Sequence, residues 1–137
     1  HKITQNCRKL DALVLLTNDD ANNWKGQVDT YIIPNPLPFS PKEKSTCSNK
    51  QAIFVGRMCE QKGYEYLLQA WELVHRIHPD WILNVFGDGE ERAKIQKKLI
   101  KRKLDKTIIL NETTKNIQDE YLKSSICILS SRFEGFG

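Results

Sequence analysis

Residues 52–89 read AIFVGRMCEQKGYEYLLQAWELVHRIHPDWILNVFGDG, and this stretch decides the fold. The apolar run 52–55 ends at a glycine and has the length of a parallel strand that is buried on both faces. Apolar residues then recur at steps of three and four positions, which predicts an amphipathic helix over 64–78, ended by Pro79. A second apolar run, 81–86, ends at another glycine. The stretch therefore predicts a strand, a helix and a second strand, the unit from which parallel sheets are built.

The same alternation continues toward the C-terminus. A helix is expected over 90–104, a strand over 107–110, a short helix over 117–123 and a strand over 126–129. Strands that alternate with helices form right-handed crossovers between parallel neighbours. The fold class is therefore α/β, with a doubly wound, Rossmann-like parallel sheet.

The first third of the chain differs in pattern and predicts part of another domain. A strand is expected over 12–16, a short helix after Thr17, and a strand over 31–33. Three prolines within 34–38 exclude both helix and sheet, and the polar, aperiodic segment 34–50 has the composition of a connector. We expect 1–33 to be the tail of one domain, 34–50 a linker, and 51–137 the first part of a second domain, with the sequence cut at both ends.

The composition sets limits on function. The 137 residues are 39% hydrophobic and 28% charged, with a formal net charge of +4, which is typical of a globular protein and does not demand a nucleic-acid partner. No apolar run approaches the ~18 residues of a membrane span. The four cysteines have no Cys-x-x-Cys spacing, so metal and redox roles are not expected, and Cys127 is expected as a buried apolar residue. Free thiols favour the cytoplasm.

Ligands of open parallel sheets bind beyond the carboxyl ends of the strands, so the loops there are the candidate site. After the first strand of the second domain, Gly56 and Gly63 let backbone approach a ligand, while Arg57 and Lys62 bring two positive charges to a helix N-terminus. A guanidinium fork, an ammonium and free backbone amides suit a diphosphate. Because neither phosphate-binding glycine motif is present, two ordinary surface cations remain an equal alternative.

The later loops carry weaker signals. Asp88, between two glycines, is typical of a turn or helix-cap residue. The polar segment 111–117 is either a plain loop or a contact for a base edge or ribose. Glu134 stands beside Gly135, Phe136 and Gly137. A lone carboxylate there would repel phosphate, so it suits sugar hydroxyls, while the glycine amides suit an anion.

In this order and spacing the motifs resemble the donor half of glycosyltransferase family 4. The residues that carry the resemblance are Gly56-Arg57, Lys62-Gly63, the helix segment 67–71, the turn 85–89 and the segment 130–137. Residues 31–36 are similar to the segment by which the family leaves its acceptor domain. The resemblance implies a retaining enzyme of the GT-B architecture, of which this chain is a truncated C-terminal half. The form of 34–38 is most like bacterial enzymes that build capsular or related surface polysaccharide.

The resemblance also implies roles for individual residues. Arg57 and Lys62 would hold the donor diphosphate and neutralise the leaving group without a metal ion or other cofactor, and Glu134 would contact the donor sugar. The donor is a UDP- or GDP-sugar, and the acceptor a saccharide or lipid-linked molecule. The remaining donor-binding residues would be Gly56, Gly87, Lys115, Asn116, Ile117, Gly135, Phe136 and Gly137. Because the second acid of the family's motif and the acceptor domain are not in the sequence, we expect the chain alone to be inactive.

Two alternatives stay open. The chain is also compatible with a donor-binding subunit that works with a separate acceptor-domain protein, as in split glycosyltransferases. The helix segment 92–106 contains eight Lys or Arg residues, which fits either a solvated face or a contact with an anionic surface. Of the anionic surfaces we favour the inner face of the cell membrane, because basic residues are not interleaved with aromatic ones as nucleic-acid binding would require.

Overall fold

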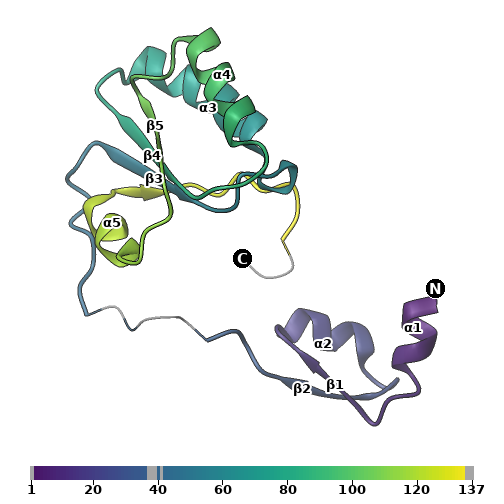
Figure 1. Ribbon diagram of the computed structural model, residues 1–137. Helices are drawn as coiled ribbons and strands as arrows, with labels where there is room; N and C mark the ends of the chain where they lie inside the picture. Colours follow the sequence, from purple (N-terminus) through teal and green to yellow (C-terminus); the bar gives the residue numbers. More distant parts are fainter. Residues whose placement is uncertain (1, 37–39, 41, 135–137) are drawn as a thin grey trace. The chain divides into compact units, whose positions relative to one another are not determined.

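The computed structural model of the chain describes residues 2–36, 40 and 42–134 (Figure 1). Between residues 40 and 41 the chain divides into two compact units. The first unit consists of helix α1 (Lys2–Cys7), strand β1 (Ala12–Leu15), helix α2 (Asn18–Trp24) and strand β2 (Asp29–Ile32). The two strands pair in parallel, and Thr17 caps α2 by accepting a hydrogen bond from the Asp20 amide. The sequence predicted the last three elements but not α1.

The second unit begins with strand β3 (Gln51–Val55), followed by a short 3-10 helix η1 (Glu60–Lys62) and helix α3 (Tyr64–Ile77). It continues with strand β4 (Ile82–Phe86), helix α4 (Arg92–Arg102), strand β5 (Ile108–Asn111), helix α5 (Ile117–Lys123) and strand β6 (Ile126–Cys127). These elements follow the predicted order, and most of their ends lie within two residues of the expected positions.

The four strands of the second unit form one parallel sheet in the order β5-β4-β3-β6. Ala52 of β3 lies beside Leu83 of β4 on one side and Ile126 of β6 on the other. The chain moves outward from β3 to β4 and β5, and then returns to the far side of β3. Because parallel crossovers are right-handed, this reversal places α3 and α4 on one face of the sheet and α5 on the other (Figure 1). The predicted doubly wound α/β sheet is confirmed.

The core lies between the sheet and the pair of helices α3 and α4. Buried side chains recur along α3 at the predicted helical spacing, at Tyr64, Leu67, Leu68 and Trp71. α4 contributes Ile95 and Leu99, one turn apart, and its exposed positions include several lysines. These side chains pack on the buried residues of β3 and β4. Helix packing against the central strands therefore holds the carboxyl edge of the sheet in place.

Two expectations for the last strand were wrong. β6 is shorter than the predicted 126–129, and the Cys127 side chain is exposed instead of buried. Among the described residues β6 pairs only with β3, so it is an edge strand, and Ile126 remains 49% exposed. An apolar run has the same appearance at the edge of a sheet as at its centre, and for this reason the pattern did not reveal the difference.

The segment before β3 is attached to the second unit. Ser45 Oγ donates a hydrogen bond of 2.7 Å to the Ser124 carbonyl, and Asn49 Nδ2 donates one of 3.0 Å to the Lys123 carbonyl. These bonds cap the C-terminal end of α5 with side chains from the chain's approach to β3. Within the described residues, every helix is too short or too polar to cross a bilayer.

Leu99→Ala should lower the free energy of unfolding by about 2–5 kcal/mol, because Leu99 is 1% exposed and its loss leaves a cavity between α4 and the sheet. Ile100, the next residue of the same helix, is 59% exposed. Ile100→Ala is therefore the matched control and should change the free energy of unfolding by less than about 0.5 kcal/mol. Urea unfolding followed by circular dichroism measures both, and equal losses would contradict this packing.

Candidate functional site

The carboxyl ends of the four strands lie at one edge of the sheet, and a loop follows each of them. Gly56 and Arg57 follow β3, Gly87 follows β4, the segment 112–116 follows β5, and the segment 128–134 follows β6. Strand order reverses between β3 and β6, and the loops after these two strands therefore meet at the same edge of the sheet from opposite crossovers. In open α/β sheets the crevice at such a reversal is where ligands bind.

A pocket of about 410 Å³ opens at this edge over the ends of β3 and β4. Backbone and side chains from three of the loops line it: Val55, Gly56, Arg57, Phe86, Gly87, Asp88, Thr113, Thr114 and Ile117. The lining combines apolar side chains with two threonine hydroxyls, a carboxylate and an exposed guanidinium. Such a mixture offers apolar surface together with hydrogen-bonding groups and one positive charge, which is typical of small-molecule sites.

The floor of this pocket requires glycine at one position and leaves little room for a side chain at a second. Gly87 has a φ of +145°, and a Cβ built on it would lie 2.0 Å from the Gly56 carbonyl oxygen. At Gly56 a Cβ would meet both the Phe54 ring and the Lys62 side chain at 3.3 Å. The Gly56 amide donates to the Phe86 carbonyl at 3.0 Å, which continues the β3–β4 ladder to the pocket. Gly87 therefore lets the ends of β3 and β4 approach as closely as the ladder demands.

An ion pair spans the reversal of strand order. Lys62, at the end of η1, places its Nζ 2.5 Å from Oε1 of Glu134, and both side chains are about one-fifth exposed. The Lys62 stem passes beside Gly56, so the pair lies next to the pocket. The hydrogen bond from Lys62 is the main cause that lowers the pKa of Glu134 below its ordinary value. The carboxyl group is therefore ionised at neutral pH.

The segment after β6 is fixed to the loop after β3 by several further contacts. Ser130 Oγ donates to the Lys62 carbonyl at 3.0 Å, and the Arg132 amide donates to the Gln61 carbonyl at 2.8 Å. Gly63 has a φ of +64°, and a Cβ on it would lie 2.1 Å from the Ser130 carbonyl oxygen. The backbone of residues 130–132 therefore lies directly on the η1–α3 junction, and this contact places Glu134 within reach of Lys62.

The residues predicted from the sequence fall into three groups. Gly56, Arg57, Gly87 and Ile117 line the pocket, and Lys62 and Glu134 pair beside it. Lys115 and Asn116 are exposed neighbours of the lining residues Thr114 and Ile117, and neither lines the pocket. Gly135, Phe136 and Gly137 lie outside the described residues.

Sequence reasoning missed three polar lining residues. Thr113 and Thr114 were included only in a polar loop, and Asp88 was interpreted as a turn residue. Asp88 does serve the turn, because its Oδ1 accepts a hydrogen bond from the Gly89 amide at 2.8 Å. The signal that could have found the threonines is their position, three and four residues beyond the predicted end of a strand at the carboxyl edge.

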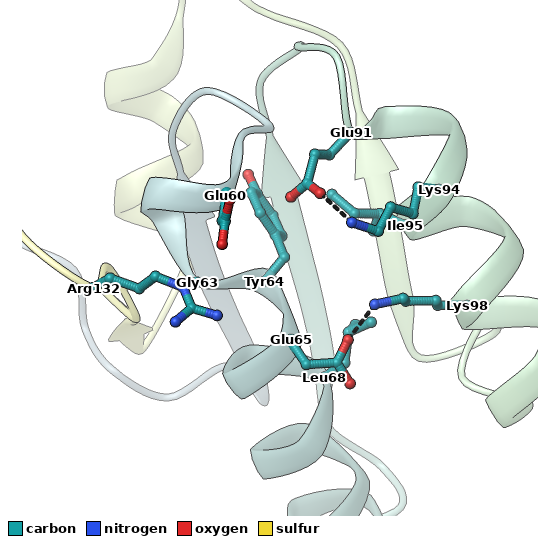
Figure 2. A pocket seen from close by; sticks show the side chains of 10 residues that line it. All are labelled: Glu60, Gly63, Tyr64, Glu65, Leu68, Glu91, Lys94, Ile95, Lys98 and Arg132. Carbon is teal, nitrogen blue, oxygen red and sulfur yellow. Dashed lines mark hydrogen bonds and ion pairs between the residues drawn. The ribbon is translucent and has the colours of Figure 1, made fainter.

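A second pocket, of about 290 Å³, lies between η1, α3 and α4 (Figure 2). Its charges are largely paired: Lys94 Nζ lies 2.5 Å from Glu91, and Lys98 forms an ion pair with Glu65. Arg132 enters from the segment after β6, and its guanidinium lies 4.8 Å from the centroid of the Tyr66 ring. Arg57, Gly56 and Gly87 do not line this pocket, so the candidate site is the pocket at the β3 and β4 ends.

In the part of the chain that the structure describes, no three His, Cys, Asp or Glu side chains lie close enough together to hold a metal ion.

Known proteins match both the sequence and the fold. Poly(glycerol-phosphate) alpha-glucosyltransferase of Bacillus subtilis is 30% identical over 135 residues, which cover 93% of this chain and 20% of that protein. The amylovoran biosynthesis glycosyltransferase AmsD of Erwinia amylovora is 30% identical over 135 residues, which cover 91% of this chain and 38% of that protein.

A crystal structure of a mutant of S. aureus TarM, in complex with Fondaparinux, alpha-GlcNAc-glycerol and UDP, superimposes on 99% of this chain and 28% of its own, with a TM-score of 0.82 at 23% identity. This likeness shows the fold, which is part of the GT-B architecture that the motifs implied. The chain spans 20% to 38% of the length of these three proteins. The family model described as "Glycosyl transferases group 1" matches residues 39–137. That match covers most of the chain and the whole of the pocket, and the chain therefore belongs to the glycosyl transferases group 1 family.

Proposed function

We propose that this chain is the nucleotide-sugar-binding part of a retaining glycosyltransferase whose parent builds bacterial surface polysaccharide. One observation carries the proposal: Lys62 and the ionised Glu134 pair at the reversal of strand order, beside a pocket that has a glycine floor and is lined by Arg57. A sugar nucleotide presents a diphosphate and a set of sugar hydroxyls. The two cations complement the diphosphate, and the carboxylate complements the hydroxyls.

The diphosphate binds between Arg57 and Lys62. Arg57 is exposed and makes no ion pair with any described residue, so its guanidinium fork is available to phosphate oxygens. When the bond between sugar and phosphate breaks, negative charge develops on the leaving diphosphate, and fixed cations stabilise that charge. We propose that these two side chains supply the positive charge and that donor binding needs no divalent metal ion.

Glu134 binds the sugar of the donor. As an ionised carboxylate it accepts hydrogen bonds and donates none, so it suits hydroxyl groups and repels phosphate. Its partner Lys62 lies between it and Gly56, on the side of the pocket where the diphosphate is placed. The order of groups along the crevice is then nucleoside, diphosphate and sugar.

The nucleoside occupies the pocket at the β3 and β4 ends. Val55, Phe86 and Ile117 offer apolar surface to a base, while the Thr113 and Thr114 hydroxyls are available to the base edge or the ribose. The names of the similar proteins support a finer proposal. TarM was crystallised with UDP, and the B. subtilis and E. amylovora proteins are named for poly(glycerol-phosphate) and amylovoran. We therefore favour a UDP-sugar over a GDP-sugar, a saccharide or lipid-linked acceptor, and a place in the cytoplasm at the inner face of the membrane.

Arg57→Ala should weaken binding of UDP to the chain by about 10- to 100-fold, the effect of losing charge-assisted hydrogen bonds to phosphate. Isothermal titration calorimetry with UDP and with GDP, each with and without EDTA, measures the affinity and identifies the nucleotide that the site prefers. Lys106→Ala removes an exposed cation before β5, at the opposite edge of the sheet, and should leave the affinity unchanged. Equal affinity of wild type and Arg57→Ala, or a loss of binding on adding EDTA, would contradict the proposed site.

Lys62→Met should move the pKa of Glu134 upward toward its ordinary value, because the lysine hydrogen bond is the main cause of its depression. A depressed pKa in the folded state means that the pair stabilises the fold above the unfolded pKa of about 4.3, and that this contribution is lost as pH falls through the folded pKa. Carboxyl carbon NMR titration of wild type and variant measures the shift.

Glu65 is the internal control for this titration, because Lys98 lowers its pKa and should continue to do so in Lys62→Met. An unchanged Glu134 midpoint in the variant would show that the pair does not form in solution.

The solvent face of α4 favours a second role, as a contact for an anionic membrane. Lys94, Lys98 and Arg102 are neutralised by glutamates, whereas Lys97 and Lys101 are exposed and make no ion pair with any described residue. These two lysines lie one helical turn apart and point away from the core. We propose that they place the chain near anionic lipid, where a lipid-linked acceptor would be found.

The double variant Lys97→Glu/Lys101→Glu should lower binding to vesicles of mixed phosphatidylserine and phosphatidylcholine by at least tenfold at low salt, since each basic residue contributes about 1 kcal/mol near such a surface. Lys50→Glu/Lys123→Glu changes the net charge equally at lysines that are already paired with acids, and should bind nearly as wild type. Co-sedimentation measures both. Equal losses of vesicle binding in the two double variants would show that only net charge matters and would contradict a specific α4 contact. Unchanged binding of Lys97→Glu/Lys101→Glu would also contradict the proposal.

A further inference from the structure

Arg92, the first residue of α4, differs from the other basic residues of this helix because its side chain binds the backbone of two strand ends. Its Nη1 donates to the Gly87 carbonyl at 3.0 Å and to the Asn111 carbonyl at 3.1 Å, and its Nη2 donates to the Leu110 carbonyl at 3.2 Å. One guanidinium thus binds three carbonyls at the ends of two neighbouring strands. Nothing in the sequence distinguished Arg92 from the other seven Lys and Arg residues of the segment 92–106.

These three carbonyls belong to the loops that form the pocket. Gly87 is part of its floor, and Leu110 and Asn111 are the last residues of β5, just before the lining residues Thr113 and Thr114. The β4–β5 ladder itself ends here, at the pairing of Phe86 with Asn111. Beyond that point, among the described residues, no backbone hydrogen bonds join the segments that follow β4 and β5. The Arg92 side chain joins them instead, through its bonds to carbonyls of both segments.

The arginine is itself firmly placed. Its backbone amide donates to the Gly89 carbonyl at 3.1 Å, and its Nη1 also approaches the buried Met58 sulfur at 3.8 Å. Within the described residues it forms no ion pair with a carboxylate, which sets it apart from Arg102 of the same helix. Among the described residues no carboxylate therefore neutralises this half-buried guanidinium beside the pocket.

The neighbouring floor residue is held in the same manner. The Tyr64 hydroxyl, from the first residue of α3, donates to the Gly56 carbonyl at 3.2 Å. Burial is the main reason that the pKa of Tyr64 is raised, so this hydroxyl stays protonated and can donate. The carbonyl of each floor glycine therefore accepts a hydrogen bond from the first residue of the next α-helix along the chain.

We infer that Arg92 is a positioning residue of the nucleotide pocket, which holds the loop after β5 at a fixed distance from Gly87 and so sets which base fits. The inference rests on the proposed function, because it assigns the base and ribose to the space between these two loops. Arg92 acts through the three carbonyls and through Thr113 and Thr114, and does not itself touch the nucleotide. A lysine ammonium cannot reproduce the planar fork that reaches both strands.

The test compares Arg92→Lys with Arg102→Lys in the full 137-residue chain. Both residues are half-buried arginines of α4, but Arg102 binds Glu65 and Glu72 away from the pocket. In Arg92→Lys the amide resonances of Asp88, Asn111 and Glu112, which share peptide groups with the three carbonyls, should shift, and Arg102→Lys should leave them in place. Unshifted resonances in Arg92→Lys would overturn the inference whatever the chain binds.

Nucleotide titration of the same variants supplies the functional result. Arg92→Lys should bind UDP about tenfold more weakly and should also change the ratio of UDP to GDP affinity, which a merely less stable chain would not do. Arg102→Lys should keep both affinities. If Arg92→Lys keeps the wild-type affinity for UDP and the wild-type ratio of UDP to GDP affinity, the positioning role alone is overturned. If the wild type binds neither nucleotide, the proposed function is overturned as well.

A measurement on the wild type keeps the inference testable if Arg92→Lys does not fold. Saturating UDP should shift the Nε resonance of Arg92, because the nucleotide fills the space between the loops that this side chain joins, and should leave the Nε resonance of Arg102 unmoved. An Arg92 resonance that does not respond to a nucleotide that binds would show that the two loops are not coupled through it.

Discussion

Parallel pairing of β3 on both of its edges is the constraint on which the rest of the structure depends. On one side lies β4, the next strand along the chain, and on the other lies β6, which follows more than seventy residues later. Each pairing brings a carboxyl-end loop to the same edge of the sheet, where the segment after β6 contacts the η1–α3 junction that follows β3. The crevice is therefore a consequence of strand order, and the side chains placed in it come from segments that are distant in sequence.

At this edge the glycines have two roles: they allow close contact between backbone segments, and they leave backbone accessible to a ligand. Gly87 has room for no side chain because the Gly56 carbonyl lies where its Cβ would be, and Gly63 is limited in the same way by Ser130. The same lack of side chains leaves backbone exposed to a ligand. A substitution at Gly87 therefore cannot separate the loss of a ligand contact from the loss of strand approach, and variants of Arg57 or Arg92 are better probes of the site.

The sequence was most informative where periodicity and chemistry coincide. The apolar spacing of α3 and the apolar runs of β3 and β4 were sufficient to predict the doubly wound sheet, and topology then placed Gly56, Arg57 and Gly87 at one edge. Exposure could not be predicted in the same way, because the apolar run at Cys127 carries no mark of its edge position. Helix α1 was missed because it is short and polar.

The partners of individual side chains were harder to predict from the sequence than the positions of the residues in the fold. Eight basic residues between 92 and 106 look alike in sequence, yet the structure divides them by what lies opposite them. Lys98 and Arg102 face Glu65 of α3, and the spacing of α3 and α4 is what brings them together. Arg92 instead faces strand ends, where carbonyls outnumber amide donors. Which role a cation takes is decided by the element packed against it, and that is a property of tertiary structure alone.

Charge pairing also distinguishes the two cations of the candidate site. Arg57 has no carboxylate partner among the described residues, whereas Lys62 is already bound to Glu134. A diphosphate can therefore engage Arg57 at no cost in existing contacts, but it must share or replace a carboxylate at Lys62. Sharing is favoured, because a lysine ammonium has three donors and the carboxylate occupies only part of them. Under the proposed function, Lys62 would then hold the phosphate and the Glu134 carboxylate at a fixed separation, and this would set the distance between the leaving diphosphate and the donor sugar.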